Sequence, residues 1–489
     1  MTALEDWLAR IHGSERGAHV IAALDYDGTL IEGFSAKPLY DHRLKHLEMG
    51  SLELARVLLA AAGGISTPEE FAKFLDISLE AWRGRPEEEL ADLGRRLFKH
   101  VTASRLRPEM WRIVQAHRRM GHTIVLASSA TRYQLDPVVE ELDAQHGLCT
   151  ALEIEDGLLT GRTAGPALWG PEKASGLEAL ARATGADLAD AFGYSNGDED
   201  VPFLDAVGVP VSVNPESDLE RTAEERDWPI LRCAPRGGRP GVRDVVRTAA
   251  LYGGMGAGAC VGFGVGVLRR SRSVAVDLAS GPGADLGLAL SSIDVDVVQG
   301  AEHLWSARPC VFVFNHQSKL DVPIMMKLLR SSYTGVAKAQ AKHIPVFGQV
   351  FQLAGVAFVE RGDTDQAKRA LEPAVAKVRE ERMSLVLSPE GTRSVTPRLG
   401  PFKKGAFHIA MQAEVPMVPV VIRNAYEVMW RGAQTVRPGR VEVAVLPPVD
   451  TADWSVKTIE DHVAEVRGMF LETLDNWPTE AFVAVEVAS

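Results

Sequence analysis

The chain has 489 residues, which is enough for two domains with separate hydrophobic cores. Hydrophobic residues make up 46% of it and charged residues 24%, so the composition excludes an intrinsically disordered chain. The formal net charge of -12 argues against a dedicated nucleic-acid binder, although a local basic patch could still bind anionic lipid.

The first region, up to about residue 231, alternates short apolar runs with helical patterns. The runs His19–Leu24 and Thr123–Ala127 are rich in aliphatic residues and precede polar loops, which is typical of buried parallel strands. Between them, residues 32–110 contain no strand-like run but several helical patterns, such as Glu87–His100. These features predict an α/β fold with a helical insert between its first two strands.

Two carboxylates follow the first predicted strand directly, in the sequence Asp25-Tyr26-Asp27-Gly28-Thr29. In open α/β sheets such a loop faces the crevice at the carboxyl ends of the strands, where ligands bind. One carboxylate could attack a phosphorus atom while the other protonates the leaving oxygen. Mg²⁺ would offset the repulsion between these carboxylates and a phosphate dianion. Further along the chain, Ser128 and Lys173 could bind the phosphoryl oxygens.

With the acidic segment Phe192–Leu204, these residues resemble the haloacid dehalogenase superfamily, in particular its phosphoserine-phosphatase-like branch, subfamily IB. The resemblance covers about residues 15–232 and implies a Rossmann-like fold with a helical cap at about residues 32–110. It further implies that Asp25 is the nucleophile and Asp27 the acid/base, with Mg²⁺ held by Asp25, Asp27, Asn196 and Asp200.

Asn196 departs from the family's pattern, which has an aspartate at this position. An amide brings no negative charge, so the departure predicts weaker metal binding. Two interpretations stay open for the domain. It is either a Mg²⁺-dependent phosphomonoester phosphatase or a non-catalytic regulatory or binding module.

The stretch Arg232–Arg243 is rich in Pro, Gly and Arg, which is typical of a linker. The 20 uncharged residues Ala249–Leu268 that follow it are long enough to cross a bilayer. Glycines recur four apart in this segment, and that spacing is also typical of a closely packed helix. A membrane-associating segment and a buried packing helix therefore both fit. We expect domain boundaries at 1–232, 233–272 and 273–489.

A stronger chemical signal follows the predicted strand Cys310–Phe314. His316 and Asp321 are five positions apart, about one turn or slightly more on a helix, so their side chains could meet. The carboxylate would fix the imidazole tautomer and stabilise the ring as it takes a proton. Three later blocks follow in order. The first ends in Arg361, the second contains Glu390, Gly391 and Arg393, and the third is the apolar segment Val415–Pro419. Lys403 and Lys404 lie between the last two blocks.

The order of these blocks and the residues in them resemble the glycerolipid acyltransferase family of 1-acyl-sn-glycerol-3-phosphate acyltransferases over about residues 292–450. The resemblance implies that His316 is the general base on the free hydroxyl of lysophosphatidic acid and that Asp321 orients it. Acyl-CoA or acyl-carrier protein would be the acyl donor. By the same resemblance, Arg361 and Arg393 bind the acceptor phosphate, with Lys403 or Lys404 as weaker candidates. Glu390 and Gly391 would shape the loop around that phosphate.

The whole sequence predicts a bifunctional enzyme of phospholipid biosynthesis that makes phosphatidic acid and also hydrolyses a phosphomonoester. The alternatives are an acyltransferase with a non-catalytic N-terminal domain, and a membrane-anchored scaffold with two inactive sites. Residues 1–13 contain Glu5 and Asp6 and lack the apolar run of a signal peptide. We therefore expect both domains to face the cytoplasm at a membrane lipid surface, without a nucleic-acid partner.

Overall fold

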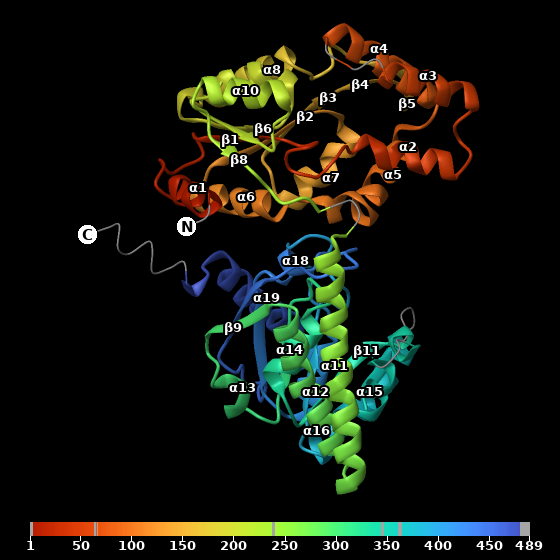
Figure 1. The fold of residues 1–489 in the computed structure, drawn as a ribbon, viewed down its shortest axis with the longest axis vertical. Helices are drawn as coiled ribbons and strands as arrows, with labels where there is room; N and C mark the ends of the chain where they lie inside the picture. The colour runs from red at the N-terminus through yellow and green to blue at the C-terminus, as the bar shows by residue number, and fades with distance from the viewer. Residues whose placement is uncertain are drawn as a thin grey trace. The chain divides into compact units, whose positions relative to one another are not determined.

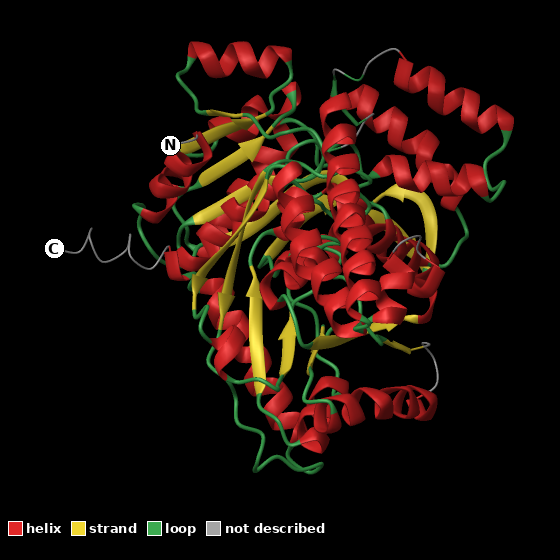
Figure 2. Ribbon diagram, turned by 60° about the horizontal axis from the view of Figure 1, so that its bottom comes forward, coloured by secondary structure: helices red, strands yellow, loops and turns green. Residues whose placement is uncertain are grey.

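The computed structural model describes residues 3–62, 65, 67–236, 240–343, 347–359 and 364–479. The chain folds into two compact units, Met1–Gly238 and Arg239–Ser489. Each unit has its own central sheet with helices packed around it (Figures 1 and 2).

The N-terminal unit is built on a six-stranded sheet in the order β3-β2-β1-β6-β7-β8, in which every pairing is parallel. Its first strand is buried along its whole length, as expected where helices cover both faces of a sheet. The strands of this sheet are β1 (Ile21–Asp25), β2 (Thr123–Thr131), β3 (His146–Thr150), β6 (Phe192–Ser195), β7 (Val209–Val213) and β8 (Ile230–Leu231). Because β1 lies between β2 and β6, the loops after these three strands meet at one edge of the sheet.

Alternate residues of β1 and β2, including Ile21, Ala23 and Val125, pack against Leu177 and Phe203 from the covering helices. The helices of this layer and its neighbours are α1 (Ala3–His12), α6 (Pro108–Met120), α7 (Arg132–Leu142), α8 (Pro171–Thr184), α9 (Val201–Asp205) and α10 (Ser217–Glu225). Three short 3-10 turns connect them, η2 (Thr102–Arg105), η3 (Leu188–Asp190) and η4 (Asp198–Asp200).

A helical cap lies between β1 and β2 in the chain. Its helices are α2 (Ala36–Lys45), α3 (Ser51–Ala62), α4 (Pro68–Leu79), η1 (Glu80–Trp82) and α5 (Glu87–His100). The cap has a small apolar core that includes Leu75, Trp82 and Leu90. Leu152 and Leu159, from the antiparallel pair β4 (Leu152–Glu155) and β5 (Leu158–Thr163), belong to the same core. The hairpin lies outside the predicted cap of residues 32–110, because it is far from those residues in the chain.

The C-terminal unit has a seven-stranded sheet in the order β12-β11-β13-β10-β14-β15-β9. Its pairings are parallel except for the antiparallel pair of β14 and β15. The strands are β9 (Ile293–Gln299), β10 (Val311–Phe314), β11 (Tyr333–Lys338), β12 (Ala357–Val359), β13 (Ser384–Leu387), β14 (Met417–Ile422) and β15 (Gly439–Val445). Since β10 lies between β13 and β14, the loops after these three strands come together.

The apolar run of β10 faces two separate cores. Phe312 and Phe314 point into one core, and Val311 and Val313 point into the other, as the period of two in a strand requires. The helices of this unit are α11 (Val242–Arg269), α12 (Arg272–Leu290), α13 (His303–Ser306), α14 (Asp321–Leu329), α15 (Phe347–Leu353), α16 (Thr364–Glu380), α17 (Gly405–Ala413), α18 (Ala425–Val428) and α19 (Ile459–Asp475), with the 3-10 turn η5 (Ala339–His343). Helices such as α14 and α17 contribute to these cores.

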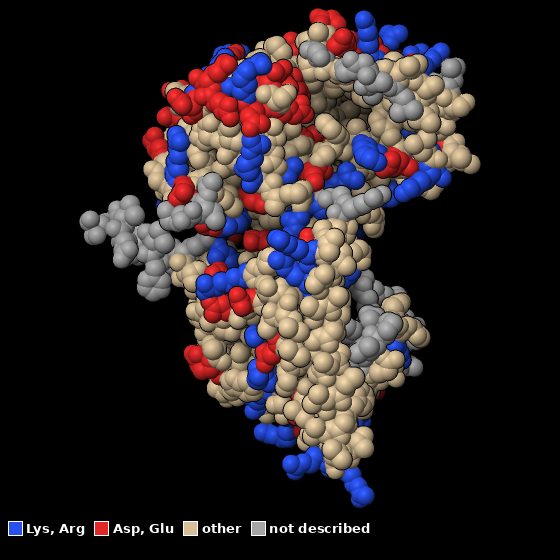
Figure 3. Space-filling model, viewed as in Figure 1, with Lys and Arg blue, Asp and Glu red and all other residues tan. Residues whose placement is uncertain are grey.

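The glycine-rich segment lies within α11, which pairs with α12 over most of its length. Gly254, Gly258, Gly262 and Gly266 are all buried against α12, so the recurring glycines allow the two backbones to approach closely. The opposite side of α11 exposes apolar side chains, and Figure 3 shows a mostly uncharged surface over this helix. In the described part of the chain, α11 is the one helix long and apolar enough to cross a membrane, judged by length and composition only.

Candidate active sites

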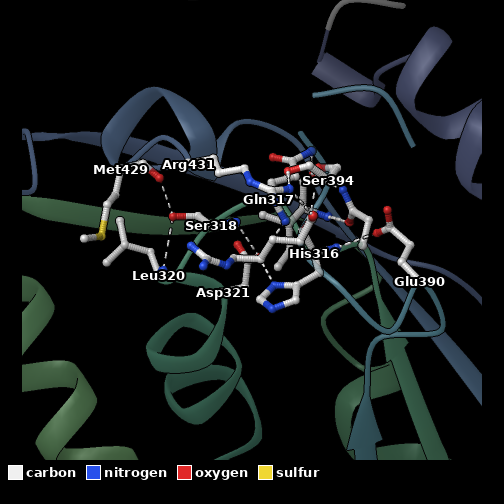
Figure 4. A network of polar contacts seen from close by, with 12 residues as sticks. His316, Gln317, Ser318, Leu320, Asp321, Glu390, Ser394, Met429 and Arg431 are labelled. Atoms are coloured by element: carbon white, nitrogen blue, oxygen red, sulfur yellow. Dashed lines mark hydrogen bonds and ion pairs between the residues drawn. The ribbon is translucent and has the colours of Figure 1, made fainter. Parts of the chain in front are cut away.

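His316 and Asp321 meet in the loop that joins β10 to α14 (Figure 4). His316 Nδ1 lies 2.7 Å from Asp321 Oδ2. The prediction that the pair lies along a helix is wrong. Residues 315–320 form a loop, and α14 begins only at Asp321.

Asp321 organises this loop through a single buried oxygen atom. Besides the imidazole, Oδ2 accepts the backbone N–H groups of Gln317 at 2.7 Å and Ser318 at 2.8 Å. Because a carboxylate can only accept from His316 Nδ1, the proton of the neutral ring is on Nδ1 and the lone pair is on Nε2. No residue in the described part of the chain hydrogen-bonds to Nε2, which leaves that atom available to take a proton from a substrate hydroxyl.

Glu390 joins the loop after β13 to the loop after β10. Its two carboxylate oxygens accept the backbone N–H groups of His316 at 2.7 Å and Gly400 at 3.0 Å. Burial raises the pKa of Glu390, and these two N–H groups partly offset that rise. Ser394 adds a second connection, since its backbone N–H donates to the carbonyl of His316 at 2.9 Å. Glu390 thus joins the backbones of the two loops.

The predicted phosphate-binding cations differ in their surroundings. Arg393 lies in the same loop as Glu390, and its side chain makes no hydrogen bond or ion pair with other described residues. Lys403 lies beside Gly391, where a Cβ added to the glycine would come within 3.3 Å of the lysine Nζ. Gly391 has a φ of +67°, a conformation that favours glycine. Lys404 instead pairs with Glu460 on α19. Arg361 lies outside the described residues.

Lys173 joins two carboxylates of the N-terminal unit. Its Nζ lies 2.9 Å from Asp25 Oδ1 and 2.6 Å from Asp200 Oδ2, and all three side chains are buried. Although burial alone would lower the pKa of Lys173, the charges of Asp200 and Asp25 raise it. Burial raises the pKa of Asp25 to about 6, with the charge of Lys173 acting in the opposite direction.

Asp27 has a different partner. Its carboxylate accepts the backbone N–H of Ser35 at 2.7 Å and the Ser35 hydroxyl at 2.9 Å. Burial and the charge of Asp25 raise the pKa of Asp27 to about 7. A carboxyl group with this pKa can carry a proton near neutral pH, as a general acid must.

The remaining predicted residues surround Asp25. Asp25 Oδ2 and Asn196 Oδ1 each lie 2.9 Å from Thr29 Oγ1. Ser128 is buried, and its hydroxyl accepts the backbone N–H of Ala130 at 3.1 Å. It lies where the pairing of β2 with β3 becomes irregular.

Within the described residues, no group of three or more His, Cys, Asp or Glu side chains converges as a metal site. Asp25, Asp200 and the amide of Asn196 nevertheless form an all-oxygen donor set of the kind Mg²⁺ prefers. Asp200 Oδ1 is buried and has no hydrogen-bond partner among the described residues, which suits a cation as its missing partner. Asp25 and Asp200 would bring two negative charges to Mg²⁺. The carboxylate of Asp27, which was also predicted as a ligand, is bound to Ser35 instead.

Two family models match separate parts of the chain. Residues 22–205 match the family described as haloacid dehalogenase-like hydrolase, and residues 297–423 match the family described as acyltransferase. The chain joins a haloacid dehalogenase-like domain to an acyltransferase domain. Both predicted resemblances and the predicted α/β fold class are therefore confirmed.

The acyltransferase domain is similar to the 1-acyl-sn-glycerol-3-phosphate acyltransferase of Limnanthes alba. The two are 34% identical over 177 residues, which is 36% of this chain and 62% of the relative. The chain thus spans about three-fifths of the length of this relative. The solved acyltransferase PlsC from Thermotoga maritima has 23% identity and a TM-score of 0.41, with 48% of this chain and 98% of that one covered.

The haloacid dehalogenase-like domain is similar to a probable phosphoserine phosphatase from Vibrio cholerae. That solved structure has 21% identity and a TM-score of 0.35, with 45% of this chain and 63% of that one covered.

Several residues of both domains escaped the sequence analysis. The hydroxyl of Thr29 binds Asp25, and the hydroxyl of Ser35 binds Asp27. The sequence signal that could have indicated these roles is a hydroxyl residue shortly after the Asp-x-Asp motif. In the acyltransferase domain, Asn315 pairs with the backbone of Ile422 in both directions, at 2.7 and 2.8 Å, and so joins the His316 loop to β14. Arg431 carries no local signal, because its partners are more than 35 residues away in the chain.

Proposed function

We propose that the chain transfers an acyl group from acyl-CoA or acyl-carrier protein to the free hydroxyl of lysophosphatidic acid, giving phosphatidic acid. The observation that carries this proposal is the His316–Asp321 pair, with Nε2 of the imidazole available and Arg393 without a partner in the described residues of the adjacent loop. Similarity to 1-acyl-sn-glycerol-3-phosphate acyltransferases supports the choice of acceptor.

In the proposed reaction His316 Nε2 takes the proton of the acceptor hydroxyl as its oxygen attacks the thioester carbon. A C–O bond forms, the C–S bond breaks, and the thiolate leaves and recovers the proton from the imidazolium. Asp321 stabilises the imidazolium and keeps the ring oriented, which general-base catalysis requires. Cationic side chains near the loop after β13 would hold the acceptor phosphate so that the hydroxyl meets the imidazole.

Labelled acyl-CoA and lysophosphatidic acid, given to the full chain in detergent, test this proposal. We expect labelled phosphatidic acid from the wild type and a rate at least about a thousandfold lower from His316→Ala. The control is His303→Ala, since His303 lies on α13 and its nearest ionic partner is Glu302 at 3.8 Å. Equal product from wild type and His316→Ala would refute the assignment.

We further propose that the N-terminal domain hydrolyses a phosphomonoester with Mg²⁺ bound by Asp25, Asn196 and Asp200. The cation would offset the repulsion between these carboxylates and the phosphate dianion. Asp25 attacks phosphorus, and the bond from phosphorus to the ester oxygen breaks as Asp27 protonates that oxygen. Water, losing a proton to Asp27, then cleaves the phosphoryl group from Asp25 and releases inorganic phosphate. Lys173 and Ser128 bind the phosphoryl oxygens. The raised pKa of Asp27 supports its role as the acid.

The competing candidate is a non-catalytic regulatory domain, which the uncharged Asn196 favours. Phosphate release by the full chain, measured with and without Mg²⁺ and compared with Asp25→Asn, distinguishes the two. Release that requires both Mg²⁺ and Asp25 supports the phosphatase, and release that Asp25→Asn does not lower refutes it. For the whole chain we propose association with a membrane lipid surface through the exposed side of α11, with both domains on the cytoplasmic side.

A further inference from the structure

A loop beyond the matched acyltransferase segment contacts both loops of the candidate acyltransferase site. This loop, Met429–Ala433, follows α18, whereas the family match ends at residue 423. The carbonyl of Met429 accepts the hydroxyl of Ser318 at 2.6 Å, and the carbonyl of Ala433 accepts Lys319 Nζ at 3.5 Å. Both partners belong to the loop that carries His316 and Asp321, and Figure 4 shows the contact of Ser318 with Met429.

Arg431 connects the same loop to the loop after β13. Its Nη1 donates to the carbonyl of Arg393 at 2.8 Å and to the carbonyl of Ser394 at 3.2 Å. Ser394 in turn donates its backbone N–H to the carbonyl of His316. Only Nη1 of the Arg431 guanidinium is used in these contacts, so its other N–H groups can bind a ligand.

Lys319, Arg393 and Arg431 form a group of cations that lacks neutralising charge. Burial lowers the pKa of Lys319 and of Arg431, and the positive charge of Arg393 lowers both further. None of the three has an ion pair with a carboxylate among the described residues, whereas Lys404 pairs with Glu460. Three cations held together without an anion repel one another, and a bound anion would remove that repulsion.

We propose that Lys319, Arg393 and Arg431 form one subsite that binds the phosphate group of the acceptor lipid. The proposal rests on the acyltransferase function proposed above and adds Lys319 and Arg431 to its site. Loop Met429–Ala433 builds the subsite by holding the backbone of Arg393 and the ammonium group of Lys319. Arginine suits this ligand, because its planar N–H groups can bind two phosphate oxygens at once.

Phosphate groups could reach this subsite from two sources, the acceptor or the CoA part of the donor. The acceptor fits better, since its free hydroxyl and its phosphate are on neighbouring carbons of glycerol. A phosphate bound a few residues from His316 therefore brings the hydroxyl to the imidazole. In acyl-CoA the whole pantetheine arm separates the thioester from the nearest phosphate.

Steady-state kinetics of the full chain in detergent test the subsite. The acceptors are oleoyl-lysophosphatidic acid and monooleoylglycerol, which lacks the phosphate, and the donor is oleoyl-CoA. For Arg431→Gln we expect the acceptor KM for lysophosphatidic acid to rise about ten- to a hundredfold, because the variant loses one charge-assisted hydrogen bond to the phosphate. Lys319→Gln should raise it about three- to tenfold, because this side chain is more exposed. The KM for oleoyl-CoA and any rate with monooleoylglycerol should stay within about twofold.

Arg431→Lys keeps the charge and should recover part of the acceptor affinity, which a purely structural role would not predict. Arg440→Gln is the matched control, since Arg440 is an exposed arginine of the same domain that pairs with Asp296. A rise in the donor KM alone would assign the subsite to CoA and overturn the proposal. A fall in kcat with both KM values unchanged would show that Arg431 only supports the loop, and would also overturn it.

Direct binding separates failure of this proposal from failure of the proposed function. We expect the wild type to bind oleoyl-lysophosphatidic acid without donor at least about tenfold more tightly than Arg431→Gln does. If the wild type acylates no lipid but shows this difference, the acyl-transfer assignment fails and the subsite stands. If acylation occurs but Arg431→Gln and wild type bind the lipid equally, the subsite is refuted.

Discussion

Asp321 Oδ2 lies 2.7 Å from His316 Nδ1 and also accepts two backbone N–H groups of the intervening loop. One buried oxygen atom therefore fixes both the tautomer of the imidazole and the path of the chain around it. Loss of the carboxylate should affect catalysis more than it affects folding, because an amide of the same shape can still accept from the loop.

Asp321→Asn tests this relationship. The amide cannot hold the Nδ1 proton in the same way, and it does not stabilise an imidazolium, so we expect kcat for acyl transfer to fall about a hundred- to ten-thousandfold. Thermal unfolding should change far less than activity does. Asp296→Asn is the control, because that exposed aspartate pairs with Arg440 away from the site. A kcat within threefold of wild type would contradict the role of Asp321.

Asn196 supplies a second prediction. It shares Thr29 with Asp25, so a carboxylate at this position would add a third negative charge to the proposed Mg²⁺ ligands. We expect Asn196→Asp to lower the Mg²⁺ concentration for half-maximal phosphate release by about tenfold or more. Without Mg²⁺ the same variant should unfold at a lower temperature, because the added charge repels Asp25. An unchanged Mg²⁺ dependence would remove Asn196 from the metal site.

Periodicity and motif order predicted much of this fold. The helix Glu87–His100 has the bounds expected from its apolar pattern, and the predicted strand Cys310–Phe314 differs from β10 by one residue. Local sequence could not show that the β4–β5 hairpin completes the cap, because a contact with residues some 70 positions away leaves no periodic trace. For the same reason the motifs located His316 and Glu390 but not Arg431, which reaches them only through folded loops.

A buried hydrogen-bonded chain in the N-terminal unit predicts a pH dependence of stability. His117 Nε2 lies 2.8 Å from the Tyr194 hydroxyl, and His117 Nδ1 lies 2.8 Å from His122 Nδ1. His122 Nε2 lies 2.8 Å from the carbonyl of Glu15, which can only accept. These contacts place every proton with both rings neutral, so a further proton on either ring would set one donor against another.

Burial, together with the neighbouring His122, lowers the pKa of His117 well below 6.5. Below pH 6.5 the unfolded chain then binds a proton that the folded chain does not, so stability falls as the pH drops. Between pH 7.5 and 5 we expect a loss on the order of 2 kcal/mol from His117. Hydrogen exchange of peptides covering β6 measures this loss of stability. The loss should be smaller in His117→Gln, which lacks the imidazole but keeps the same titrating carboxylates. Parallel pH profiles for both proteins would contradict the prediction.

The α11–α12 pair offers two glycines on one helix with opposite surroundings. A Cβ at Gly258 would come within 2.3 Å of Gly283 Cα, whereas a Cβ at Gly256 would meet nothing within 4 Å. We expect Gly258→Ala to destabilise the unit by about 1–3 kcal/mol, since the helix backbones must separate. Gly256→Ala should instead stabilise it by up to about 1 kcal/mol through helix propensity. Thermal unfolding in detergent compares them, and equal effects would show that the glycine stripe does not set the packing.

The exposed side of α11 predicts how the chain associates with lipid. Leu268 is 84% exposed near the end of this helix, immediately before Arg269 and Arg270. A leucine that enters the acyl boundary contributes about 1.5–3 kcal/mol, and the adjacent arginines favour anionic headgroups. We therefore expect Leu268→Glu to lower binding to vesicles of phosphatidylcholine and phosphatidylglycerol by about tenfold or more in a flotation assay.

Val456→Glu is the matched control for Leu268→Glu. Val456 is also an apolar residue of the same unit and is 68% exposed, but it lies outside α11. If lipid contact is confined to α11, Val456→Glu should bind vesicles within about twofold of wild type. Added salt should weaken the binding of wild type and of Val456→Glu to the same extent. Equal losses in the two variants would mean that the added charge itself prevents binding, and α11 would lose its assignment as the lipid-contacting surface.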